Sequence, residues 1–238
     1  MTNDDPDRSL IKAFEDLDFL KREELRPVRL MLELMKPDML QREAGVRSTI
    51  VVFGSARMSE NAPYYRVARE FARLVSQSCQ IDGQCDYVVV TGGGPGVMEA
   101  ANRGASDVGA NSIGLNIVLP SEQKPNPYIT PGLGFTFHYF ALRKMHFMLR
   151  AKALVVFPGG FGTMDELFEA LTLVQTGKVE HLPVVLVGRA FWEKALNFQH
   201  LLDEGMISTR DLNLFRYAET AEEAWGHILH YHATHGGA

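Results

Sequence analysis

The chain has 238 residues, of which 46% are hydrophobic and 22% charged, so it can bury the core of a three-layer α/β domain. Its formal charge of −5 argues against nucleic acid or a membrane surface as a partner, because both are bound through a basic patch. With two cysteines, no signal peptide and no apolar run of the roughly 20 residues that a membrane span needs, the sequence predicts a cytoplasmic protein without a disulfide scaffold.

Residues 1–45 are predicted to form a helical extension ahead of the main domain. Apolar side chains recur at helical spacing in residues 10–17 and 28–35, and Pro27 and Pro37 suit the start and the stop of the second helix. We expect an element for packing or subunit contact, with a lid over a pocket as the alternative.

Beyond the extension, short apolar runs alternate with amphipathic helices. In the first half, strands are predicted at residues 49–53, 87–90 and 112–119. A helix at residues 63–76 follows the first strand, and a helix through Met98, Ala101 and Ala105 follows the second. The third strand leads into a long loop at residues 120–134, rich in Pro, Asn and Gly. Loops of that length in a compact domain are more often functional than idle.

The second half of the chain continues the alternation. Strands are predicted at residues 135–140, 153–157, 183–187 and 214–217, and helices at residues 142–151, 165–176, 191–202 and 221–232. Strands separated by helices imply right-handed crossovers and parallel pairing. The predicted fold class is therefore α/β, with a three-layer, doubly wound, mostly parallel, Rossmann-like sheet that forms a single domain over residues 46–238.

Three of the predicted strands end in glycine turns, at Gly54-Ser55, at residues 92–96 and at residues 159–162. The carboxyl ends of parallel strands meet at one edge of a sheet, so the three turns should lie together. Glycine permits close approach of a ligand to the backbone, and the N–H groups at a helix start attract anions. We expect a phosphate site there, with tight strand-to-helix packing as the alternative explanation of the glycines.

The common motifs of nucleotide enzymes and hydrolases are missing. The segment Gly92-Gly93-Gly94-Pro95-Gly96-Val97 lacks the final small residue of GxGxxG/A, and no P-loop, nucleophile elbow, HExxH or CxxC segment occurs. The histidines near the C-terminus lack an ordered spacing, so no metal site is predicted. Carboxylates, arginines and lysines must then supply the chemistry.

Glu166 has two interpretations. Thr163-Met164-Asp165-Glu166 matches the capping box, in which Thr163 caps a helix and Glu166 reaches back to the cap, and the local sequence favours this reading. The alternative is a carboxylate beside a bound phosphate, which requires cations between the two anions. Arg57, Arg143 and Lys144 are the candidates for that role.

These residues resemble those of a known family. Residues 158–166, Pro-Gly-Gly-Phe-Gly-Thr-Met-Asp-Glu, match the PGGxGTxxE signature of the LOG family, the cytokinin riboside 5′-monophosphate phosphoribohydrolases, and Arg143-Lys144-Met145 resembles its RKxxM-type segment. The resemblance covers about residues 48–225 and points to the longer bacterial branch of the family. It implies hydrolysis of the N-glycosidic bond of a nucleoside 5′-monophosphate without a metal or an organic cofactor.

The resemblance also implies roles for individual residues. Glu166 and Arg143 match the catalytic glutamate and arginine, and the carboxylate would stabilise an oxocarbenium-like ribosyl cation. The residues implied to bind substrate are Gly159, Gly160, Gly162, Thr163, Ser55, Arg57, Gly93, Gly94, Lys144 and Asn116.

The base preference is expected to depend on other segments. The longer branch that the chain resembles differs from the plant-type enzymes in the turn at residues 92–102, at Arg57 and in the loop at residues 120–131, which bears Glu122, Gln123 and Asn126. These positions are expected to face the base or the ribose, so the resemblance implies AMP rather than a cytokinin nucleotide.

Two other functions stay open from the sequence. A non-catalytic nucleotide or molybdenum-cofactor carrier could use the same fold, and a lysine decarboxylase is a distant third because no lysine has a recognisable pyridoxal-phosphate context. The expected partner is a small-molecule nucleotide, and the apolar helices around Arg143 and Gln175 could form a homodimer or a higher homo-oligomer.

Overall fold

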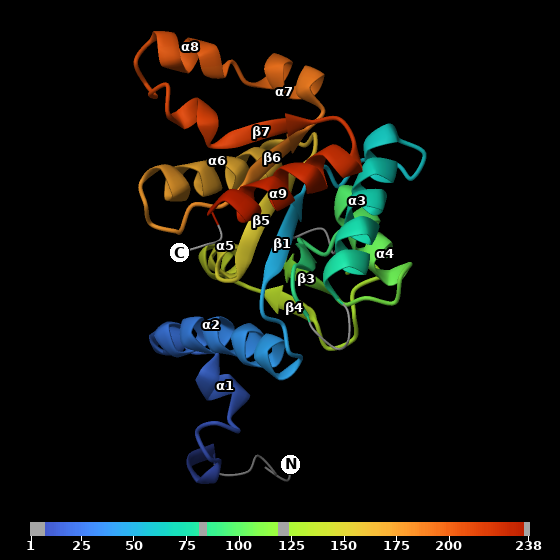
Figure 1. Cartoon of the computed structure of the whole chain (residues 1–238). Helices are drawn as coiled ribbons and strands as arrows, with labels where there is room; N and C mark the ends of the chain where they lie inside the picture. The colour runs from blue at the N-terminus through green and yellow to red at the C-terminus, as the bar shows by residue number, and fades with distance from the viewer. Residues whose placement is uncertain (1–7, 81–84, 119–123, 236–238) are drawn as a thin grey trace.

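The computed structural model describes residues 8–80, 85–118 and 124–235, and within these ranges seven strands form one parallel sheet (Figure 1). The strands are β1 (Thr49–Phe53), β2 (Val88–Thr91), β3 (Ser112–Ile117), β4 (Gly134–Phe137), β5 (Ala151–Val156), β6 (Val184–Val187) and β7 (Phe215–Ala218). Their order across the sheet is β4-β3-β2-β1-β5-β6-β7. The predicted α/β, doubly wound class is confirmed, and every described strand pairing is parallel.

The central strand β1 explains why its sequence is apolar throughout. All five of its residues are buried. Side chains alternate between the two faces of a strand, so Ile50 and Val52 pack in one core cluster while Val51 and Phe53 pack in the other. A parallel sheet covered on both faces needs apolar residues at successive positions rather than at every second one.

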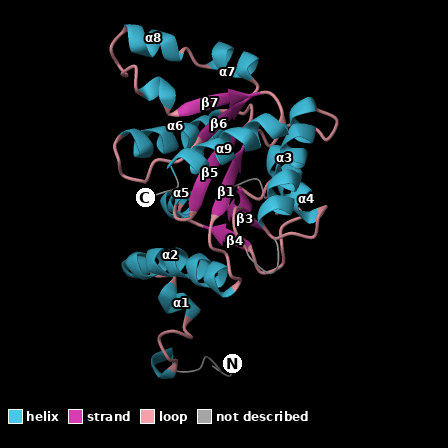
Figure 2. Cartoon of the chain, viewed as in Figure 1, coloured by secondary structure: helices cyan, strands magenta, loops and turns pink. Residues whose placement is uncertain are grey.

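Helices cover both faces of the sheet (Figure 2). On one face lie α3 (Pro63–Cys79), α4 (Val97–Ser106) and α9 (Ala221–His235). On the other face lie α5 (Phe140–Met148) and α6 (Phe161–Gln175), while α7 (Arg189–Ala195) and α8 (Phe198–Asp203) join the same core cluster beside β7. No helix in the described ranges is long and apolar enough to cross a bilayer.

The direction in which strands are added to the sheet reverses at β1. The strand pairs with β2 on one side and with β5 on the other, so Val51 lies opposite both Val90 and Leu154. The first four strands extend the sheet in one direction and the last three in the other. In open α/β sheets the crevice beyond the carboxyl ends of the strands at such a reversal is where ligands bind.

The N-terminal segment contains the 3₁₀ helices η1 (Arg8–Leu10) and η2 (Glu23–Leu25) together with α1 (Leu17–Leu20) and α2 (Arg26–Glu43). The prediction that Pro37 ends the second helix is wrong. Pro37 lies inside α2 and is buried, and the helix continues for six more residues. Tertiary packing outweighs the local cost of a proline here.

Two helix bounds also differ from the prediction. The single helix expected over residues 191–202 is divided, because Leu196 is extended and the Asn197 side chain accepts a hydrogen bond of 3.0 Å from the N–H of His200, which caps α8. The helix expected to end at residue 151 ends at Met148, and Ala151 already belongs to β5.

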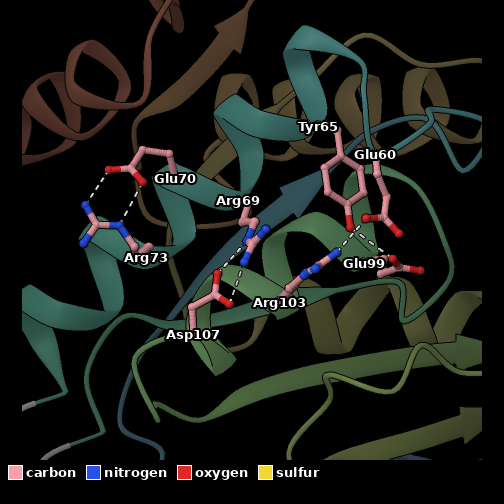
Figure 3. Close-up of polar contacts among 8 residues, drawn as sticks. All are labelled: Glu60, Tyr65, Arg69, Glu70, Arg73, Glu99, Arg103 and Asp107. Carbon is pink, nitrogen blue, oxygen red and sulfur yellow. Dashed lines mark hydrogen bonds and ion pairs between the residues drawn. The ribbon is translucent and has the colours of Figure 1, made fainter.

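Helices α3 and α4 form a tightly packed pair (Figure 3). Arg69 donates two hydrogen bonds, of 2.6 and 2.8 Å, to Asp107, and Arg103 pairs with Glu60 at 2.8 Å. Under these surface contacts, a Cβ atom at Gly104 would lie 2.0 Å from the backbone oxygen of Arg69. Only glycine allows the two helices to approach this closely.

Gly104→Ala is therefore expected to lower the free energy of unfolding by about 1–3 kcal/mol, because the added methyl group must push α3 and α4 apart. Gly226→Ala is the matched control, since Gly226 is also helical but a Cβ there would meet open space. The control should raise stability by up to about 1 kcal/mol through helix propensity. Urea denaturation of both variants measures the two effects, and equal effects of the same sign would contradict the packing argument.

Candidate active site

A cavity of ≈ 850 Å³ lies at the carboxyl ends of β1, β2 and β5, where the strand order reverses. The structure brings the three glycine turns together around it, as their positions in the sequence predict. The sequence-predicted residues that line it are Ser55, Arg57, Gly94, Asn116, Arg143, Gly159, Gly160, Gly162, Thr163 and Glu166.

The turn after β5 leaves its backbone open toward the cavity. Helix α6 begins at Phe161 with Gly160 as its N-cap, and no side chain caps it. The first N–H groups of a helix have no acceptor within the helix and lie at the positive end of its dipole. A Cβ at Gly160 or Gly162 would meet open space, so these glycines leave room for a ligand beside the backbone.

Gly159 is a glycine for a different reason. A Cβ there would lie 2.1 Å from Oγ1 of Thr163, so the missing side chain lets the threonine pack against the turn. Thr163 is buried at 7% exposure and still lines the cavity. Its hydroxyl is thereby held next to the open N–H groups.

The capping-box interpretation of Glu166 is wrong. The helix starts at Phe161, so Thr163 is its third residue and Glu166 its sixth, and Gly160 occupies the cap position. Strands that end in glycines can lead straight into a helix, which moves the helix start ahead of the predicted one. The Glu166 carboxylate lines the cavity instead.

The environment of Glu166 favours its neutral form. Burial raises the pKa of Glu166 to about 7, and the nearby positive charges of Arg143 and Lys144 oppose that rise. A carboxyl group poised near neutral pH is typical of sites that transfer or guide protons.

Arg143 reaches the cavity from α5 and is fixed by the ends of two strands. Its Nε donates to the backbone oxygen of Leu115 at 2.7 Å and its Nη2 to that of Gly92 at 3.5 Å. Its guanidinium lies over the ring of Phe147, 5.2 Å from the centroid. A Cβ at Gly92 would lie 2.5 Å from Nη2, so the glycine makes room for the arginine. Burial lowers the pKa of Arg143, and the charge of Glu166 counters this effect.

Not every glycine of the second turn, at residues 92–96, lines the cavity. Gly94 lines the cavity, whereas Gly93 does not. Gly93 has a φ of +73°, and a Cβ there would lie 2.3 Å from Oδ1 of Asn116. Gly93 therefore lies behind Asn116, whose amide lines the cavity and donates to the backbone oxygen of Phe135 at 3.4 Å.

Lys144 is not brought to the cavity. Its Nζ lies 2.8 Å from a carboxylate oxygen of Asp165 and 2.7 Å from one of Glu169, in a surface groove along α6. Arg57 is exposed at the rim of the cavity, and its backbone N–H donates to Oγ of Ser55 at 3.1 Å. Arg143 is thus the more deeply placed of the cations proposed from the sequence.

The expectation that Asn126 faces the substrate is wrong. Asn126 is buried and its Nδ2 donates to the backbone oxygens of Gly93 and Gly94, at 3.2 and 3.1 Å. The side chain braces the second glycine turn rather than lining the cavity. Glu122 and Gln123 lie outside the described residues.

The apolar wall of the cavity was not predicted from the sequence. Its side chains include Met98, Ile117, Phe140, Phe147, Phe161 and Phe191. They come from one strand and four helices, so no pattern in the sequence marked them as one surface. One signal was available, since Phe161 stands between two glycines in the sequence. In the structure Phe161 is 97% exposed.

Among the described residues, no group of three or more His, Cys, Asp or Glu side chains could hold a metal ion. Both cysteines are free, and burial raises the pKa of Cys79 to about 11, away from reactivity at neutral pH.

The chain is similar to known proteins in sequence. A family model described as "Possible lysine decarboxylase" matches residues 98–228. The chain is 27% identical over 165 residues to cytokinin riboside 5′-monophosphate phosphoribohydrolase LOG2 of Arabidopsis thaliana, covering 67% of this chain and 72% of that protein. It is 28% identical over 178 residues to a pyrimidine/purine nucleotide 5′-monophosphate nucleosidase of Escherichia coli, covering 71% of this chain but 36% of that protein.

A solved structure shares the fold. The molybdenum cofactor binding protein from the phototrophic bacterium Rippkaea orientalis aligns with a TM-score of 0.54 at 20% identity, covering 78% of this chain and 98% of that chain. At that identity the likeness shows a common fold alone.

The raised pKa of Glu166 predicts a pH-dependent stability. Between pH 4.5, the ordinary pKa of a glutamate, and about pH 7, Glu166 is ionised in the unfolded chain but protonated in the folded protein. The folded state is therefore favoured by Glu166 at low pH, and this contribution to the free energy of unfolding is lost as the pH rises through 7. Glu166→Gln removes the cost and should be more stable than the wild type by about 1–3 kcal/mol at pH 8, with the difference shrinking toward pH 4.5. Urea denaturation at both pH values tests this, with exposed Glu204→Gln as the control; an equal gain at both pH values would contradict it.

Proposed function

Because the chain belongs to the LOG family, whose family model covers residues 98–228, we propose that it hydrolyses the N-glycosidic bond of a nucleoside 5′-monophosphate. The products would be the free base and ribose 5-phosphate. The observation that carries the proposal is the half-buried Glu166 carboxylate, which lines one cavity together with the Arg143 guanidinium and an open glycine turn.

The 5′-phosphate is proposed to bind at the turn after β5. The open backbone at Gly160 and Gly162 and the start of α6 offer N–H donors in a region of positive potential. The hydroxyls of Thr163 and Ser55 lie on the same cavity surface and could add further donors. Arg57 at the rim supplies the positive charge that attracts the dianion.

The chemistry then falls to Glu166 and Arg143. As the bond from C1′ to the base nitrogen breaks, positive charge develops on the ribose, and an ionised Glu166 stabilises it. The same carboxylate can accept a proton from the water that attacks C1′. Arg143 is placed to stabilise the electron pair that leaves with the base. Its two bonds to backbone oxygens hold it in place before substrate arrives.

The substrate class is proposed to be purine nucleotides, with AMP as the first candidate. The apolar wall of Phe140, Phe147 and Phe191 offers surface on which a flat base can stack. One similar protein carries the name pyrimidine/purine nucleotide 5′-monophosphate nucleosidase, which supports an ordinary nucleotide over a cytokinin nucleotide.

The competing functions find less support. A carrier for a nucleotide or the molybdenum cofactor would not need a carboxyl group with a pKa near neutrality facing its ligand. A lysine decarboxylase needs a lysine for a Schiff base, and the cavity within the described residues is lined by none, since Lys144 is paired outside it.

We also propose that the protein forms a homo-oligomer through α5 and α6. These helices leave large apolar side chains exposed, namely Phe140, Met145, Leu149 and Phe168. Clustered apolar exposure of this kind marks interaction sites.

Met145→Glu should therefore reduce the mass of the particle in solution, measured by light scattering, because it buries a charge in the contact. Leu229→Glu is the control, since it places the same charge at a similarly exposed position on α9, across the sheet. A wild-type protein that is monomeric at micromolar concentration would contradict the proposal.

Incubation with AMP, followed by chromatography of the bases, tests the proposed activity. The wild type should release adenine, and Glu166→Gln should lose about 10²–10⁴-fold in kcat while still binding AMP, because the phosphate contacts remain. Glu204→Gln, which removes an exposed carboxylate on the far end of α8, should retain full activity. The mechanism would be excluded if the wild type released no base from all of the common nucleoside monophosphates, or if Glu166→Gln kept full activity.

A further inference from the structure

The helix that carries Arg143 is held from outside the main domain. Helix α2 packs against α5 and lies beneath it in Figure 1. Apolar contacts alone would allow one helix to slide along the other. Three polar contacts, one near each end of α5 and one inside it, remove that freedom.

The first contact is at the start of α5. The N-cap residue Tyr139 makes no side-chain cap. The carboxylate of Glu33 from α2 lies at this end instead, accepting hydrogen bonds from the two N–H groups just ahead of the helix, those of His138 at 3.0 Å and Tyr139 at 3.2 Å. A negative charge at a helix N-terminus also interacts favourably with the helix dipole.

The second contact depends on the proline inside α2. Pro37 has no N–H, so the backbone oxygen of Glu33, four residues earlier, loses its helical partner. His146 of α5 supplies the missing donor, with its Nε2 lying 3.2 Å from that oxygen. His146 is 5% exposed, and since a carbonyl can only accept, the imidazole carries its proton on Nε2.

The third contact is just beyond the end of α5. Arg150 donates to the Asp38 carboxylate at 2.5 Å and to the Asp38 backbone oxygen at 3.4 Å. The Arg150 side chain is only 13% exposed, so this pair is shielded from solvent. Glu33 and Asp38 lie on either side of Pro37, so one short segment of α2 makes all three contacts.

We propose that α2 holds α5 in position, and that Glu33 is a positioning residue which fixes where Arg143 lies in the active site. The proposal rests on the proposed function. Arg143 lies between the contacts at Tyr139 and His146, and its bond to Leu115 leaves little room for displacement of the helix. A shift of about 1 Å in a catalytic group can cost about 100-fold in rate.

The experiment compares Glu33→Ala, Glu33→Gln and Glu43→Gln in the full-length protein. Glu43 is an exposed carboxylate on the same helix, without a contact to α5 that the structure shows, so it is the matched control. For each variant, kcat and KM for AMP are measured, together with hydrogen exchange of the amides of α5. Asp38→Asn, which weakens the contact at the other end, is the second variant in case Glu33→Ala does not fold.

Glu33→Ala should lower kcat about tenfold with KM changed less than twofold, because the phosphate turn on α6 is untouched. Its α5 amides should exchange faster than those of the control. Glu33→Gln keeps an acceptor oxygen and should recover most of kcat, and Asp38→Asn should act in the same direction as Glu33→Ala.

Unchanged kcat and unchanged hydrogen exchange of α5 in Glu33→Ala and Asp38→Asn would contradict the proposal that α2 holds α5 in position. So would a loss confined to thermal stability, with kcat preserved in the folded protein. If the wild type releases no base, the proposed function fails instead, and hydrogen exchange of α5 still decides whether α2 holds that helix.

Discussion

The reversal of strand order between β1 and β5 is the constraint on which the rest of the structure depends. Because β1 pairs with β2 on one side and β5 on the other, the connections leave the two central strands in opposite directions. The space between them stays open at the carboxyl edge. Helices α4 and α6 both begin at this edge with a glycine as the cap, Gly96 and Gly160. The first N–H of α4, at Val97, donates to the backbone oxygen of Ser55 at 3.1 Å, whereas no side chain caps the start of α6 beside the cavity. The fold thus brings a helix start with N–H donors to the cavity before any side chain is considered.

Two oppositely charged groups then share a poorly solvated space. Glu166 loses hydration and its pKa rises, while Arg143 loses hydration and its pKa falls. Each charge partly offsets the cost of burying the other, and backbone oxygens of Leu115 and Gly92 complete the environment of the arginine. A site of this kind costs stability in the empty protein. Enzymes commonly accept such a cost where it places charge for the transition state.

Helix α2 contains a proline in its interior, which local sequence preferences disfavour, and a contact with another helix compensates for it. Pro37 removes a hydrogen bond from α2, and the freed oxygen of Glu33 is satisfied by His146 of α5. The hydrogen bond missing within α2 is thereby replaced by one between α2 and α5. Departures from local sequence rules are expected where tertiary contacts or function compensate for them.

The sequence by itself determined the order and type of most elements and the glycine turns that surround the cavity. Apolar runs that end in glycines indicate buried strands and the sheet edge where their turns meet, and these signals are local. Tertiary structure alone decided the rest. Arg143 and Lys144 are neighbours, but a helix turns about 100° per residue, so one enters the cavity and the other pairs outside it. Likewise, only the folded chain shows that Glu166 is no helix cap and that Asn126 braces a turn. The physical reason is that a polar group's role depends on the partner that satisfies it, and such partners lie far away in the sequence.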